Sequence, residues 1–151
     1  MSQPAQFPQQ PGPSITALTL GVRDVEASLA FYEKGLGYRR MHHVPGEIAF
    51  VQISPGVMLS LWNLTSMPSE YGDVGFGTQA PPLSLGHNAA SPAEVFALTD
   101  QALEAGATLV TEPSTRSWGG TSACVADPDG FRIDFVHNPT FSLLADGTVT
   151  V

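Results

Sequence analysis

The sequence predicts an α+β domain made of two tandem βαβββ modules, whose sheets curl around a cleft while the helices lie outside. Two observations support this fold class. The same order of strand and helix signals occurs twice, over about residues 14–64 and 82–138, and one such unit is too small to enclose a core by itself. A length of 151 residues with 42% hydrophobic composition fits a single globular domain.

The first module starts with a strand at residues 15–22, in which Leu18, Leu20 and Val22 share one face. Asp24 can cap the helix that follows, and Gly37 can end it. Three short apolar runs at 38–43, 47–53 and 57–63 are separated by Pro-Gly turns and are predicted strands. Residues 64–81 have no sustained periodicity, so we expect a linker or lid there.

The second module repeats this order, with a strand at 82–88 and a helix over 91–105. Ser91 and Glu94 form a capping box with proline between them at the first helical position, and Gly106 ends the helix. Strands are expected at about 108–113, 120–126 and 131–137. The last two are joined by the DPDG turn at 127–130, in which Pro128 fixes one dihedral and Gly130 supplies a positive φ.

The two ends of the chain differ from the domain. Residues 1–13 are rich in Pro and Gln and are predicted to form a flexible arm, without the basic start and apolar run of a signal peptide. The tail at 139–151 could form a hairpin at Asp146-Gly147 or pair with another chain. We therefore assign the domain itself to residues 14–138.

Composition restricts the partners and the compartment. The single cysteine, Cys124, cannot form an internal disulfide, and no apolar stretch is long enough to span a membrane, so we expect a cytoplasmic protein. A formal net charge of −8 argues against nucleic acid and anionic membranes as partners. It permits a cationic small-molecule ligand.

Three stretches carry a family resemblance: ITALTLGVRDVEASLAFYEKGLGYRR, ALEAGATLV and WGGTSACVADPDGFRIDF. In this order and spacing the chain resembles the vicinal oxygen chelate superfamily, which includes glyoxalase I, extradiol dioxygenases and bleomycin resistance proteins. The resemblance covers about residues 14–138. It implies two modules around a ligand cleft, and a homodimer in which protomers pair to complete their clefts.

The resemblance also implies four cleft-facing positions that supply His, Glu or Gln ligands to a divalent metal in metal-dependent members. In this sequence they fall on Ala17, Ser60, Ser84 and Asp134, with Leu83 replacing Ser84 if the register shifts by one. Alanine has no donor atom, and a neutral serine hydroxyl is a poor substitute for imidazole or carboxylate. We therefore expect neither a family-type metal centre nor another cofactor.

The rest of the predicted cleft follows from strand alternation. Thr19, Phe50 or Gln52, Trp62 and Val136 share the face of the ligand positions, and loops offer Tyr71, Phe76 and Trp118 as further candidates. By the same alternation His87 and His137 point away from the cleft, and at most one of the adjacent His42 and His43 reaches it. A small polar floor with aromatic walls suits a planar or amphipathic organic ligand.

Asp134 is the one acidic residue at the four positions, and its role is left open between three interpretations. It could bond Ser60, Ser84 or Arg132 as a structural group, anchor a cationic or hydrogen-bond-donating ligand, or act as a general base.

Three functions are therefore weighed. The first is a metal-free protein that binds or sequesters a small organic molecule, including a cationic aromatic one. The second is an enzyme of the family, of lyase, isomerase or dioxygenase type, with an atypical metal site or with Asp134 as base. The third is a degenerate domain without a ligand.

Overall fold

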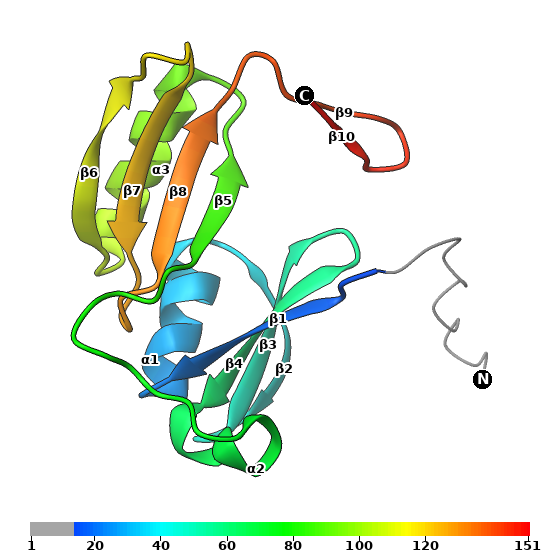
Figure 1. The fold of residues 1–151 in the computed structure, drawn as a ribbon, viewed down its shortest axis with the longest axis vertical. Coiled ribbons are helices and arrows are strands. Elements are labelled where there is room, and N and C mark those ends of the chain that lie inside the picture. Colours follow the sequence, from blue (N-terminus) through cyan, green and yellow to red (C-terminus); the bar gives the residue numbers. More distant parts are fainter. Residues whose placement is uncertain (1–13) are drawn as a thin grey trace.

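The computed structural model describes residues 14–151, and the predicted arm at 1–13 lies outside the described residues. The first module contains β1 (Ala17–Val22), α1 (Val25–Ala30), the π-helix η1 (Phe31–Gly35), β2 (Arg39–Val44), β3 (Ile48–Ser54) and β4 (Val57–Asn63). The second contains β5 (Ser84–Asn88), α3 (Pro92–Glu104), β6 (Thr108–Thr115), β7 (Thr121–Ala126) and β8 (Arg132–His137). Figure 1 shows the two modules one above the other, and the predicted fold class is confirmed.

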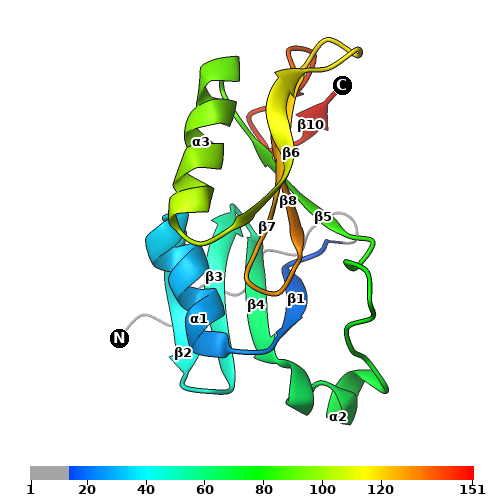
Figure 2. The ribbon, with the colours of Figure 1, turned by 90° about the vertical axis from the view of Figure 1, so that its left-hand side faces the viewer.

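Each module contributes one four-stranded sheet with the same topology. The strand orders are β1-β4-β3-β2 and β5-β8-β7-β6, and the first strand of each module pairs in parallel with the last. Helix α1 packs against β3 and β4, and α3 packs against β6, β7 and β8. Both helices lie on the same side of the molecule (Figure 2). We call the opposite surfaces of the two sheets, which α1 and α3 do not cover, the open faces.

Strand alternation sorts the side chains between the two sides of each sheet. The buried core includes strand residues that face the helices, together with Val95 of α3: Leu20, Val22, Val51, Leu59, Leu61, Val125, Ile133 and Phe135. Their neighbours in sequence, such as Thr19, Ser60 and Asp134, therefore lie on the open faces. The capping predicted for both helices is present, since Asp24 accepts from the Ala27 N–H and Ser91 accepts from the Glu94 N–H.

The first helix differs from the single α-helix that the sequence predicts. After Ala30 it widens into a π-helical turn, in which the Leu36 N–H donates to the Phe31 carbonyl at 2.9 Å. Gly35 lies in this turn against α3, where an added Cβ would be 2.5 Å from the Cβ of Ala105. The glycine thus permits the close approach of the two helices at the module junction.

The DPDG turn of the second module holds the two modules together. The carboxylate of Asp127 is buried and accepts a hydrogen bond from the Tyr32 hydroxyl at 2.6 Å. Asp129 accepts the backbone N–H of Arg23 at 2.9 Å, and the Arg23 guanidinium lies 3.8 Å from the ring centroid of Phe76. A turn that looks local in sequence therefore makes long-range contacts with the first module.

Two segments complete the chain. The predicted linker at 64–81 contains the 3₁₀ turn η2 (Leu64–Ser66) and the short helix α2 (Pro68–Tyr71). The C-terminal tail folds as a hairpin of β9 (Ser142–Leu143) and β10 (Val149–Thr150), which projects from the second module (Figure 1). Among residues 14–151 no helix has the length and apolar character needed to cross a membrane.

Candidate ligand site on the open faces

Asp134 lies in the middle of β8 on the open face of the second sheet. Its cross-strand neighbours are Gly86 on β5 and Cys124 on β7. The Ser84 hydroxyl donates a hydrogen bond to Oδ2 of Asp134. An added Cβ at Gly86 would meet nothing within 4 Å, so the half-buried carboxylate has open space on one side.

Of the three partners that the sequence left open for Asp134, the structure therefore shows Ser84. Arg132 instead donates to the carbonyl of Gly130 at 3.1 Å, and Ser60 belongs to the other sheet. One hydroxyl donor leaves further acceptor capacity on the carboxylate, because an ionised carboxylate offers about four lone-pair sites. Asp134 can therefore accept hydrogen bonds from a ligand while keeping its bond to Ser84.

Cys124, beside Asp134, is poorly suited to nucleophilic chemistry. Burial, and after it the negative charge of Asp134, raise the pKa of its thiol to about 11. The thiolate is the nucleophilic form of cysteine, so this environment suppresses reactivity at neutral pH.

The first module has the same geometry without the carboxylate. In the second module, Ser84 on β5 pairs with Arg132, which lies two residues before Asp134. In the first module, Ala17 on β1 pairs with Met58, which lies two residues before Ser60. The equivalent of the Ser84–Asp134 pair is thus Ala17 with Ser60. Ser60 is almost fully buried, with Thr19 and Phe50 as its cross-strand neighbours.

The four positions do not fit a divalent metal. Ala17 offers no donor, Ser60 and Ser84 offer neutral hydroxyls, and the single carboxylate of Asp134 is already hydrogen-bonded by Ser84. Within residues 14–151, no group of three or more His, Cys, Asp or Glu side chains is arranged to hold a metal ion.

The two tryptophans predicted for the cleft lie in separate places. Trp62 lies on the open face of the first sheet, and its indole N–H donates to the Glu47 carboxylate at 2.9 Å. Its ring packs edge-on against Tyr71 of α2, with the ring centroids 5.5 Å apart. Trp118 is 54% exposed and packs over Gly120, in the loop that leads into β7. Because the start of β7 pairs with the end of β8, Trp118 lies at the opposite end of the sheet from the DPDG turn.

Val136 takes part in a different hollow. With Asn88 and residues of the C-terminal hairpin it lines a cavity of about 320 Å³. None of the principal cavities of residues 14–151 is lined by Ser60 or Asp134. The open faces of the two sheets lie on the same side of the molecule, away from α1 and α3 (Figure 2).

Three histidines lie where strand alternation puts them. His87 packs against Phe135 on the helix side, and Nδ1 of His137 lies 3.2 Å from the carbonyl oxygen of Ala89. The ring of His42 packs in a tilted orientation against Phe50 at the open face, with the ring centroids 5.4 Å apart. The remaining histidine, His43, pairs with Glu26.

The sequence interpretation missed two groups at the module junction. One is the pair of buried DPDG carboxylates, and the other is the contact between Tyr38 and His87, whose Oη and Nδ1 atoms are 2.7 Å apart. Both connect residues at least 49 positions apart. The one sequence signal for these contacts is the DPDG turn at 127–130, which carries more carboxylates than a turn requires.

Comparison with known proteins agrees with this geometry. Residues 14–135 match the sequence profile of the Glyoxalase/Bleomycin resistance protein/Dioxygenase superfamily. Because the match covers most of the 151 residues, the chain belongs to this superfamily. A comparison with curated proteins found no match.

Solved structures of the same fold are similar over most of their length. A glyoxalase-related enzyme from Fulvimarina pelagi is 33% identical with a TM-score of 0.81, and the alignment covers 91% of this chain and 97% of that one. A glyoxalase/bleomycin resistance protein/dioxygenase from Nocardioides is 26% identical with a TM-score of 0.67 and 85% coverage of both chains. Lactoylglutathione lyase from Agrobacterium tumefaciens, at 20% identity, TM-score 0.65 and coverage of 85% and 96%, shares the fold.

Proposed function

We propose that this protein binds a small organic molecule on its open faces without a metal ion, and that Asp134 anchors a cationic or hydrogen-bond-donating group of the ligand. The observation that carries the proposal is the environment of Asp134. Its carboxylate is held by Ser84 on one side and faces open space above Gly86 on the other.

The charge and shape of the site support this assignment. The chain has a net charge of −8, which favours the approach of a cation. Trp62 and Phe50 give the open face of the first sheet an aromatic surface, on which a planar ligand can stack. We propose that binding takes place in the cytoplasm, where the single cysteine of this chain stays reduced.

We also propose that two protomers pair through their open faces. Each protomer leaves these faces unenclosed, so the pocket needs a second surface opposite Asp134. Exposed apolar residues of the C-terminal hairpin, including Phe141 and Leu143, offer additional apolar surface for such a contact. Light scattering after size exclusion tests this: a mass near twice 15.9 kDa supports the dimer, and a monomer at all concentrations contradicts it.

A second function has one observation in its favour. The Fulvimarina structure that is similar to this chain is described as a glyoxalase-related enzyme. If this chain is also an enzyme, Asp134 is the residue best placed to take a proton, since it is half-buried and has free acceptor capacity.

Binding of cationic aromatic dyes, with ethidium as the first probe, tests the proposed function. Calorimetric titration is expected to show saturable binding that Asp134→Asn weakens by about tenfold or more, because a charge-assisted hydrogen bond is lost. Asp100→Asn, which removes an exposed carboxylate from α3, is the matched control and should leave the affinity unchanged. Equal affinity in both variants would refute the role of Asp134.

A metal-loading experiment separates the two functions. Purified protein is incubated with nickel, zinc, manganese or iron, desalted, and analysed by native mass spectrometry. The metal-free proposal predicts no stoichiometric retention. One equivalent of metal that is lost in Asp134→Ala would contradict it and favour the enzyme.

A further inference from the structure

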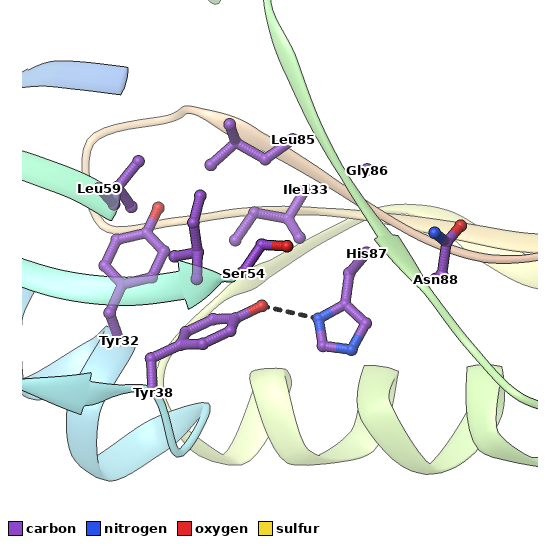
Figure 3. A pocket seen from close by; sticks show the side chains of 10 residues that line it. Tyr32, Tyr38, Ser54, Leu59, Leu85, Gly86, His87, Asn88 and Ile133 are labelled. Carbon is purple, nitrogen blue, oxygen red and sulfur yellow. Dashed lines mark hydrogen bonds between the residues drawn. The ribbon is translucent and has the colours of Figure 1, made fainter. Parts of the chain in front are cut away.

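A cavity of about 290 Å³ lies between the two modules (Figure 3). Its floor is made of fully buried side chains, Tyr32, Leu59 and Ile133. Its rim includes the exposed residues Ser54 and Gly86, so it opens to solvent between the β3–β4 turn and β5. The other lining residues, apart from Ser54, Gly86 and Asn88 at the rim, face the helix side, so the body of the cavity lies behind the open faces.

At the module junction, the turn between the last two strands differs between the two modules. In the second module, the turn between the last two strands carries Asp127 and Asp129, which hold Tyr32 and Arg23 of the first module. The turn at the same place in the first module is Ser54-Pro55-Gly56, which has no carboxylate. This turn lines the cavity through Ser54, but it has no carboxylate that binds the second module as Asp127 and Asp129 bind the first.

The polar end of the cavity is the pair formed by Tyr38 and His87, whose Oη and Nδ1 atoms are 2.7 Å apart (Figure 3). When the hydroxyl donates to His87, the oxygen keeps a lone pair to accept a bond from a ligand. When the imidazole donates instead, the hydroxyl proton is free for a ligand acceptor. Tyr38 can thus serve a ligand group that both donates and accepts, which is the behaviour of another hydroxyl.

The cavity offers no charge to an ionic ligand. None of its lining residues is Asp, Glu, Lys or Arg, and apart from Ser54, Gly86, Asn88 and the Tyr38–His87 pair its walls are aliphatic or aromatic. Burial raises the pKa of Tyr38 and lowers the pKa of His87, so both groups favour their neutral forms near pH 7. A buried ion would lose its hydration here without a counter-charge.

We propose that this junction cavity is a second binding site, for an uncharged single-ring molecule that bears a hydroxyl group, with the ring against Leu59, Leu85 and Ile133 and the hydroxyl at Tyr38. A volume of about 290 Å³ is ample for one ring, since an apolar cavity of about 150 Å³ already binds benzene. Asp134 does not line this cavity, although Gly86 at the rim is its cross-strand neighbour, and the proposal does not rest on the function proposed for the open faces.

The test compares three probes that differ only in one substituent: 4-fluorophenol, 4-fluorotoluene and 4-fluorobenzoate. Affinities are measured by ¹⁹F NMR, and the site is located by chemical-shift changes of the Gly86 amide and the His87 ring. We expect 4-fluorophenol to bind about five- to tenfold more tightly than 4-fluorotoluene, as one hydrogen bond provides, and 4-fluorobenzoate not to bind.

Two variants make the result decisive. In Tyr38→Phe the ring remains and the hydroxyl is removed, so the preference for 4-fluorophenol over 4-fluorotoluene should disappear while 4-fluorotoluene binds as before. In Asp134→Asn all three affinities should be unchanged. The proposal is overturned if 4-fluorophenol leaves Gly86 and His87 unshifted, if its preference survives in Tyr38→Phe, or if Asp134→Asn abolishes its binding.

Discussion

The hydroxyl of Tyr32 donates a 2.6 Å hydrogen bond to Oδ2 of Asp127, across 95 positions of sequence. Both groups are buried, and Oδ1 of the same carboxylate accepts the backbone N–H groups of Asp129 and Phe131 at 2.9 Å each. The carboxylate therefore shapes the DPDG turn with one oxygen and binds the first module with the other. The stability of the turn and the docking of the modules depend on the same side chain.

Tyr32→Phe is expected to lower the free energy of unfolding by about 1–3 kcal/mol, because it leaves one oxygen of a buried carboxylate without its donor. Urea unfolding followed by circular dichroism measures this loss. Tyr71→Phe is the matched control, since Tyr71 is 50% exposed, and it should change stability little. Equal stability of the two variants would show that the module contact does not depend on this bond.

Asp127 also predicts a pH dependence. Burial raises the pKa of Asp127 above 3.8, although the bonds from Tyr32, Phe131 and Asp129 act in the opposite direction. A carboxyl whose pKa is raised on folding binds its proton more tightly in the native state. Its contribution to stability is then fully present below pH 3.8 and is lost as the pH rises through the folded pKa.

The measurement compares the wild type with Asp127→Asn, whose side chain has the same shape and does not titrate. The stability of the wild type relative to this variant should fall as the pH rises from 3.8 toward neutrality. The difference in stability between wild type and variant isolates the contribution of Asp127. Carboxylates such as Glu33, whose pKa is lowered by Arg40, change stability with pH in the opposite direction and are present in both proteins. A difference that is constant or rises with pH would contradict the prediction.

The thiol of Cys124 should react slowly with iodoacetamide at pH 8, since its pKa is about 11. Asp134→Asn removes a negative charge that raises this pKa, and should therefore accelerate the alkylation. Cys124 is the only cysteine of the chain, so mass spectrometry of the intact protein follows its reaction directly. The exposed Asp100→Asn should react at the wild-type rate, and acceleration by both variants would point to a general charge effect.

Ser28 lies fully buried in α1, and its hydroxyl has no hydrogen-bond partner among the described residues. Ser28→Ala is expected to raise the free energy of unfolding by about 1 kcal/mol, since it removes an unsatisfied polar group and improves helix propensity. Thr99→Val provides the contrast, because the equally buried Thr99 hydroxyl donates to the Val95 carbonyl at 2.7 Å. Thermal unfolding should show a higher melting temperature for Ser28→Ala and a lower one for Thr99→Val.

Much of the fold could be predicted because its signals are local. The helix ends at Asp24, Ser91 and Gly106 are set by groups within one turn of the chain, and strand alternation separates buried Leu59 and Ile133 from Ser60 and Asp134. The π-helical turn over Phe31–Gly35 could not be predicted in this way. It is associated with the close approach of Gly35 to Ala105, which belongs to the other module.

The sequence by itself determined the two-module architecture, the family, and the chemistry of the four ligand positions, because residue type alone excludes Ala17 as a donor. Only the tertiary structure decided that Ser84 is the partner of Asp134, that Asp127 binds Tyr32, and that Tyr38 and His87 meet at a cavity. These contacts join residues 49 to 95 positions apart. Such distances carry no periodic signal, and they are set by how the two sheets and their helices pack.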